Sequence, residues 1–172
     1  KTTTLKLILG LIKPDQGDVS VFGQKVTTTN RLSILRRSGS LIENPGGYGH
    51  LTGLENMQIV QKLKGVSEAE IVRALKTVRL YEQRDKKLKN YSLGMRQRLG
   101  LAQAIMENPK ILILDEPFNG LDKDGVADMR KYLLELKERG KTILIASHSS
   151  EDIEILCDTV CEMDKGVLTK IK

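Results

Sequence analysis

The sequence predicts an α/β protein with a parallel-sheet core and an inserted all-helical segment, and three observations support this. Two aliphatic runs, 110–115 and 142–146, have the length and the Ile/Leu content of buried parallel strands. Each run is followed by a segment with helical periodicity, and this alternation of strand and helix is typical of α/β folds. Between residues 53 and 108 the periodicity is helical throughout, which indicates an insertion.

The first part of the chain, residues 1–43, is expected to contain short elements. An apolar-faced helix at its start should end near Gly10, because Pro14 just beyond cannot continue it. Gly23 is expected to turn the chain after the first strand. In order, we expect a helix over 3–11, a strand over 17–22, a helical turn over 32–37 and a buried strand over 39–42.

The middle part, residues 44–108, is expected to be all-helical after a loop over 44–47. Ser67 and Glu70 have the spacing of a capping box, in which each side chain binds a free amide at the start of a helix. We expect helices near 53–64, 67–80 and 94–107.

The last part, residues 109–172, is expected to complete the core. Both aliphatic strands lie here, and Gly140 is expected to stop the helix between them. We expect strands over 110–115 and 142–146, helices over 124–139 and 150–156, and two short strands near 159–163 and 167–171.

The composition excludes some classes of function and partner. The chain has 28 basic and 22 acidic residues and a net charge of +6, with the basic residues spread in short runs. No basic arm interleaved with aromatic residues is present, so a nucleic-acid partner is not expected. The chain contains 40% apolar and 3% aromatic residues, which indicates an aliphatic core. No apolar run approaches the roughly 20 residues that a membrane-spanning helix needs.

Two carboxylates follow the first aliphatic strand directly. Asp115 ends the run, and Glu116 and Pro117 come next. Open α/β sheets bind ligands at the carboxyl ends of their strands. Asp115 is therefore expected to hold Mg²⁺, directly or through water, and Glu116 to polarise a water that attacks a phosphate. The alternative is a strand that ends in solvated acids.

Three other segments can bind phosphate, although each has a structural alternative. Lys1, Thr2 and Thr3 open an apolar helix, and the lysine could reach phosphates while the Thr2 hydroxyl ligates Mg²⁺. His148 follows the second aliphatic strand and could bind a γ-phosphate, or it could be structural. In the third segment, over 91–98, a helix begins at Ser92 and Gly94; its serine could bind an anion or act only as an N-cap.

These segments, in this order, resemble the ATP-binding subunit of ABC transporters, and the resemblance covers the whole chain. The pieces that carry it are Lys1-Thr2-Thr3, similar to the end of the Walker A loop; Tyr91-Ser92-Leu93-Gly94-Met95, similar to the signature motif; Asp115-Glu116, similar to Walker B with its catalytic glutamate; Asn119-Gly120-Leu121-Asp122, similar to the D-loop; and His148, similar to the switch histidine.

The resemblance implies a P-loop NTPase (RecA-like) core, divided as 1–43 and 109–172, with a helical subdomain over 44–108. It implies ATP and Mg²⁺ as cofactors, with Lys1, Thr2 and Thr3 at the nucleotide. It also implies a second ATP-binding subunit arranged head to tail. Ser92 and Gly94 of one copy would then bind the γ-phosphate of the other copy's ATP, and Asp122 would make contact across the dimer.

Further partners follow from the same resemblance. The helical subdomain would dock on an integral membrane permease, at the cytoplasmic face of a bacterial plasma membrane. Glu116 would orient the attacking water, and His148 would hold the γ-phosphate. Because the chain opens at Lys1 and not at a methionine, we expect sequence upstream that completes the phosphate-binding loop and the sheet. The chain by itself is therefore expected to bind ATP poorly, not to hydrolyse it, and to expose apolar surface.

The chain departs from the family pattern at two places. Leu93 and Met95 stand in the signature where Gly and a polar residue are usual, while Ser92 and Gly94 remain. Glu43 stands where the family usually has a Gln that touches Mg²⁺ and the attacking water, so it is expected to be a metal ligand and a catalytic residue. With its surroundings, Glu43 resembles the bacitracin-export and lantibiotic-immunity branch, which indicates an exporter of peptide antibiotics.

A second hypothesis is a non-transport member of the same superfamily that acts on ribosomes or DNA. Repair and chromosome members carry a long coiled coil between the positions of Glu43 and Ser92, and the 49 residues here are too few for one. Ribosome-acting members carry two such domains and a charged linker. Co-purification with an integral membrane protein would favour transport, whereas sedimentation with ribosomes would favour the alternative.

Overall fold

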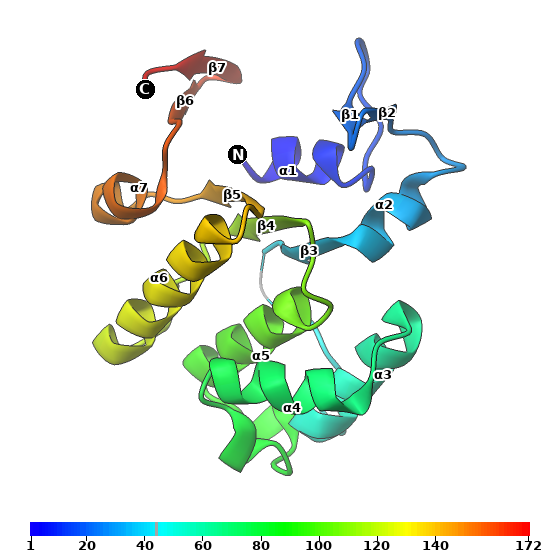
Figure 1. Cartoon of the computed structure of the whole chain (residues 1–172), viewed down its shortest axis with the longest axis vertical. Helices are drawn as coiled ribbons and strands as arrows, with labels where there is room; N and C mark the ends of the chain where they lie inside the picture. The colour runs from blue at the N-terminus through cyan, green and yellow to red at the C-terminus, as the bar shows by residue number, and fades with distance from the viewer. Residues whose placement is uncertain (44) are drawn as a thin grey trace.

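A three-stranded parallel sheet forms the centre of the molecule. In this computed structural model, which describes residues 1–43 and 45–172, the strands lie in the order β3 (Ser38–Leu41), β4 (Ile111–Asp115) and β5 (Thr142–Ala146). Figure 1 shows helix α1 (Thr2–Ile8) above this sheet and the helices α5 (Leu93–Ile105) and α6 (Lys123–Glu138) below it. The predicted α/β fold with a parallel sheet is confirmed.

The central strand β4 has two different buried faces. Leu112 and Leu114 pack into the larger core, which the helices below the sheet form. Ile113 packs on the opposite face, in a smaller core with Leu5 and Leu9 from the segment of α1. Because side chains alternate along a strand, Asp115 is directed to the same face as Ile113. The pleat therefore places this carboxylate on the side of α1.

Three helices without an intervening strand fill the middle of the chain. They are α3 (Gly53–Lys64), α4 (Glu68–Thr77) and α5, with two short 3-10 turns, η1 (Tyr81–Gln83) and η2 (Leu88–Asn90), between α4 and α5. The predicted helical insertion is thus present, and the 3-10 turns were not predicted. The expected subdomain begins at Asn44, which lies outside the described residues. Buried aliphatic side chains join the helices: Met57, Ile71, Leu75, Leu99 and Leu101.

The predicted capping box at Ser67 is wrong. Ser67 precedes α4, but its side chain accepts no hydrogen bond there. Glu70 instead binds Arg73 on the same helix, with Oε2 2.8 Å from the guanidinium Nε. A capping box does form at the start of α3, where Thr52 and Glu55 bind each other's backbone amides.

The ends of the chain form smaller elements around the sheet. Helix α1 stops at Ile8, earlier than predicted, and Gly10 follows in the left-handed region at φ 65°. The strands β1 (Ser20–Val21) and β2 (Gln24–Lys25) form an antiparallel hairpin, of which only the first strand was predicted. The remaining elements are α2 (Arg31–Arg37), α7 (Ser150–Leu156), and the antiparallel strands β6 (Cys161–Asp164) and β7 (Val167–Lys170).

A lysine joins the helical segment to the sheet. Lys64, at the end of α3, donates hydrogen bonds of 3.0 Å to the carbonyls of Leu35 and Ser38, at the junction of α2 and β3. It also pairs with Glu107, which follows α5 and whose side chain is 6% exposed. Burial raises the pKa of Glu107, and the hydrogen bond from Lys64 opposes that rise. Oε2 of Glu107 is buried and has no hydrogen-bond partner among the described residues.

The outer side of β5 borders a hollow of about 470 Å³. Leu5 and Ile8 of α1, Ile143 and Ile145 of β5, and residues near the C-terminus line it. Leu144 of the same strand is 37% exposed. Over the described residues, no helix combines the length and apolar character needed to cross a bilayer.

Candidate functional site

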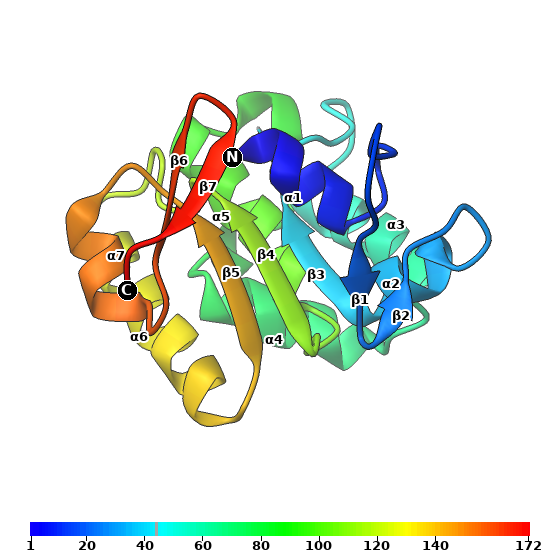
Figure 2. The same ribbon diagram turned by 90° about the horizontal axis from the view of Figure 1, so that it is seen from above.

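The carboxyl ends of β4 and β5 lie beside the start of α1. Figure 2 shows α1 close to the arrowheads of the three strands. The hydroxyl of Thr2 donates a 2.6 Å hydrogen bond to Oδ2 of Asp115, whose residue is 7% exposed. Strand β4 is fixed in register there, because Asp115 pairs with Ala146 of β5. The predicted pair of oxygen ligands, Thr2 and Asp115, is therefore brought together.

Glu116 lies at the centre of a group of charged side chains. Its Oε1 accepts a hydrogen bond of 3.2 Å from the ammonium of Lys1 and lies 3.5 Å from Nε2 of His148. Its Oε2 is 3.4 Å from the backbone amide of His148. The Lys1 ammonium also donates to the carbonyl of Ser147, at 3.2 Å. The structure thus brings together Lys1, Thr2, Asp115, Glu116 and His148, which we call the strand-end cluster.

The backbone aims Glu116 into this cluster. Its amide donates to the carbonyl of Ala146 at 2.8 Å, which continues the β4–β5 ladder by one residue. The chain then turns at once, because Glu116 has a φ of 47°, in the left-handed region that non-glycine residues rarely adopt. Such strain persists where surrounding contacts fix it, and it is concentrated at functional sites.

Gln97 of α5 supports the turn from the helical side. Its side chain is buried, and its amide nitrogen donates to the carbonyls of Glu116 and Pro117, each at 3.1 Å. These hydrogen bonds satisfy carbonyls that the strained turn removes from the sheet. Helix α5 is thereby attached directly to the segment that carries Glu116.

The signature-like segment lies at the start of α5. Ser92 is the N-cap of this helix, and its hydroxyl accepts a 3.2 Å hydrogen bond from the amide of Met95. Gly94 packs tightly on Gly120, since a Cβ on Gly94 would lie 2.4 Å from the Gly120 carbonyl oxygen. Ser92 and Gly94 form no hydrogen bond with the strand-end cluster within the described part of the chain. A single copy therefore does not bring them to the other predicted phosphate ligands.

Asp122 lies beside α5 of its own chain. Its Oδ1 pairs with the guanidinium of Arg98 at 2.5 Å, and Arg98 also donates to the carbonyl of Val78. Partial desolvation raises the pKa of the Asp122 carboxyl, but the hydrogen bond and the charge of Arg98 outweigh it, so the pKa lies below its ordinary value. The predicted contact of Asp122 with a second copy is not among these interactions, although two thirds of its side chain is exposed.

Glu43 follows β3 and forms no hydrogen bond with the strand-end cluster in the part of the chain that the structure describes. Its Oε1 pairs with the ammonium of Lys6 at 2.5 Å, and it has a φ of 59°. Thr3 is exposed and forms no side-chain hydrogen bond in residues 1–43 and 45–172. Sequence reasoning placed Glu43 and Thr3 at the same site as Lys1, and the structure brings neither into hydrogen-bonding contact with that cluster.

The oxygen donors fit a metal shared with phosphate. Thr2 and Asp115 offer two neighbouring oxygens, and Mg²⁺ takes few protein ligands, retains waters and binds phosphate oxygens. Among the described residues, no group of three or more His, Cys, Asp or Glu could enclose a metal by itself. The cluster is therefore suited to a nucleotide with its Mg²⁺, and Lys1 adds a cation that can bind the phosphates.

Three supporting residues were not predicted. Gln97, Arg98 and Lys6 hold the turn after β4, Asp122 and Glu43 respectively. Gln97 and Arg98 lie within the signature-like segment over 91–98, and a buried polar side chain such as that of Gln97 usually has a hydrogen-bond partner. No local signal predicts the contact of Lys6, because its partner lies 37 residues away in the sequence.

Comparison with known proteins agrees with this geometry. The ABC transporter family matches residues 1–119. The bacitracin transport ATP-binding protein BcrA of Enterococcus faecalis is 45% identical over 172 residues, which cover 99% of this chain and 56% of BcrA. The lantibiotic transport ATP-binding protein SrtF of Streptococcus pyogenes is 38% identical over 160 residues, which cover 93% of this chain and 68% of SrtF.

A solved ATP-binding subunit of an ABC transporter has the same fold. It superimposes with a TM-score of 0.88 and 29% identity, covering 99% of this chain and 74% of that structure. The chain spans a little over half the length of BcrA. The match covers the segments that form the strand-end cluster, except His148, which follows residue 119. The chain belongs to the ABC transporter family, among its ATP-binding subunits.

Proposed function

We propose that this chain binds and hydrolyses ATP as part of the subunit that powers an exporter of peptide antibiotics. The convergence of Lys1, Thr2, Asp115, Glu116 and His148 at one edge of the sheet carries the proposal. A cation, two oxygens of the kind that bind Mg²⁺, a carboxylate and an imidazole can together hold a triphosphate and orient an attacking water.

Each residue has a proposed role. Lys1, with Thr2 and Thr3, would bind the phosphates, and Thr2 and Asp115 would hold Mg²⁺, which would offset charge on the phosphoryl oxygens. Glu116 orients the attacking water, and His148 binds the γ-phosphate. The ammonium of Lys1 donates a hydrogen bond to Glu116 in the structure. A phosphate that binds there would compete for this ammonium and release the carboxylate of Glu116.

A second copy is proposed to complete the site. Ser92 and Gly94 are presented at the start of α5 and do not reach the strand-end cluster of their own chain. A head-to-tail dimer would bring them to the γ-phosphate bound by the partner, with Asp122 near the seam. Leu93, which is 62% exposed in the single copy, is proposed to be buried in the interface between the two copies.

The helical segment is proposed to couple ATP hydrolysis to the membrane permease. We keep the division into a core over 1–43 and 109–172 and a subdomain over 44–108. The subdomain would dock on an integral membrane permease, which places the subunit at the cytoplasmic face of a bacterial plasma membrane. The names of BcrA and SrtF support bacitracin or a lantibiotic as the exported peptide.

Nucleotide turnover is tested with the full-length subunit. Glu116→Gln removes the carboxylate base and keeps the size of the side chain, so we expect Mg²⁺-ATP to bind while hydrolysis falls at least about 100-fold. Glu138→Gln is the control, because this exposed residue at the end of α6 lies outside the cluster. Unchanged hydrolysis in the Glu116→Gln variant would refute the proposed role.

Transport is tested separately in cells that express the subunit with its permease. We expect the wild-type pair to raise survival in bacitracin or a lantibiotic, and Glu116→Gln to abolish that effect. Sedimentation of the subunit with ribosomes, without protection against either peptide, would instead favour the non-transport alternative.

A further inference from the structure

One face of α1 holds two carboxylates from neighbouring strands. Thr2 and Lys6 are four residues apart and therefore lie on the same side of the helix. Thr2 binds Asp115 at the end of β4, and Lys6 binds Glu43 just beyond β3. The helix that carries the proposed phosphate ligand Lys1 thus also contacts the carboxylate that follows the next strand.

Glu43 and Glu116 occupy matching places in the sheet. Leu41 of β3 pairs with Leu114 of β4, and each glutamate comes two residues after its leucine. Both glutamates have positive φ, 59° for Glu43 and 47° for Glu116. Both glutamates therefore have a left-handed backbone at matching positions and lie at the same edge of the sheet.

The partners of the two glutamates differ. Glu116 is bound by Lys1 and lies beside His148, whereas Glu43 has only Lys6 as a charged partner in the described residues. The side chains of Lys6 and Glu43 are 31% and 60% exposed. Ion pairs with this exposure contribute little to folding stability, because water screens them and both side chains lose freedom. Such a pair is easily exchanged for another partner.

We propose that Lys6 is a positioning residue that competes with the divalent cation for the carboxylate of Glu43. The proposal rests on the proposed function, in which a nucleotide and its Mg²⁺ bind at this edge. Without the cation, the Lys6 ammonium balances the charge of Glu43 and holds it along α1. When the cation binds, Glu43 exchanges one positive partner for another, so Lys6 sets the concentration at which this exchange occurs.

The test measures how tightly the full-length subunit binds Mn²⁺ in the presence of a non-hydrolysable ATP analogue. Electron paramagnetic resonance gives the Mn²⁺ concentration at half-saturation. Lys6→Met keeps the aliphatic stem and removes the competing charge. We expect the Mn²⁺ concentration at half-saturation to fall about two- to fivefold, the range that an exposed ion pair can supply. Lys6→Arg, which keeps the charge, is expected to retain most of the wild-type midpoint.

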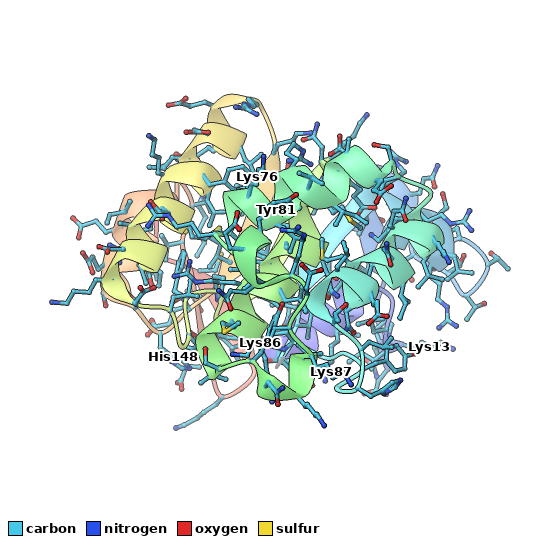
Figure 3. All side chains as sticks on the ribbon, turned by 90° about the horizontal axis from the view of Figure 1, so that it is seen from below. Lys13, Lys76, Tyr81, Lys86, Lys87 and His148 are labelled. Atoms are coloured by element: carbon cyan, nitrogen blue, oxygen red, sulfur yellow. The ribbon has the colours of Figure 1, made fainter. Side chains whose placement is uncertain are left out.

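Two controls separate this effect from a general change of charge. Lys13→Met removes an exposed lysine, labelled in Figure 3, that forms no ion pair in the described residues, and should leave the midpoint unchanged. In a Glu43→Gln background, Lys6→Met should no longer shift the midpoint, because the carboxylate for which the cations compete is gone.

The outcomes distinguish the proposal from the function on which it rests. An unchanged or raised midpoint in Lys6→Met, or the same shift in the Glu43→Gln background, would overturn the competition and leave the proposed function intact. Binding of a fluorescent ATP analogue is measured on the same samples. A wild-type subunit that binds no nucleotide would overturn both.

Discussion

Lys64 is expected to be one of the most sensitive positions for stability. Lys64→Met keeps the aliphatic stem but leaves Glu107 without its cation, and the side chain of Glu107 is only 6% exposed. Breaking a buried pair by removing one partner costs about 3–5 kcal/mol. The Lys64 side chain is 21% exposed, which allows some water to enter, so we expect a loss near 3 kcal/mol in the free energy of unfolding.

The pH dependence gives an independent check. Burial raises the pKa of Glu107, so the folded state binds this proton more tightly than the unfolded state. The free energy of unfolding therefore falls as pH rises from the ordinary carboxyl pKa through the raised pKa. Lys64→Met removes the cation that opposes the rise in pKa. The variant should accordingly lose less stability at about pH 5 than at about pH 8.

Urea denaturation of the full-length subunit measures the loss of stability and its pH dependence. The wild type, Lys64→Met and Lys64→Met/Glu107→Met are compared at both pH values. The double variant removes both charges and should recover at least half of the loss, because an apolar pair can replace a buried ion pair. A Lys64→Met variant within about 1 kcal/mol of wild type at both pH values would refute the reasoning.

Three other outcomes are expected. Gly39→Ala should destabilise the protein by about 3 kcal/mol or more in thermal denaturation, because a Cβ there would lie 1.9 Å from the Ala104 carbonyl oxygen. Gly46→Ala is the control and should leave the stability unchanged, because a Cβ there would have nothing within 4 Å. Gln97→Ala removes the side-chain donor of the Pro117 carbonyl, while the Glu116 carbonyl keeps the Asn119 amide, so the variant should lose about 1–3 kcal/mol in urea denaturation. Ser92→Ala should cost about 1 kcal/mol through the lost cap and, by light scattering, weaken ATP-dependent dimerisation.

Asp115 and Glu116 could be predicted from a strong local signal, whereas Lys1, Thr2 and His148 are weak signals alone and were predicted from the order of the segments. An aliphatic run that stops at Asp115 is expected to be a buried strand, and parallel strands bring their carboxyl ends to one edge. His148 follows the neighbouring strand, so the same reasoning applies to it. Strand β2 had no such signal, since Gln24 and Lys25 are polar and exposed and pair only across a tight hairpin.

Side-chain partners were harder to predict than strand ends. The Ser67–Glu70 spacing fits a capping box, but Arg73 lies one turn further along and offers Glu70 an ionic partner. For Lys6 and Glu43 no local pattern exists, because the contact depends on how α1 lies on the sheet. Asp122 was expected to face a second copy, and its pairing with Arg98 follows from the packing of α5 beside it.

Helix α5 is attached at both of its ends. Its thirteen residues make a rod about 20 Å long. Near the start, Gly94 and Gln97 contact the turn that carries Glu116, and just past the end, Glu107 is bound by Lys64. Because a helix of this length is rigid, a movement at one end also displaces the other end. A displacement of the turn that carries Glu116 would therefore also act on the contact between Lys64 of α3 and Glu107.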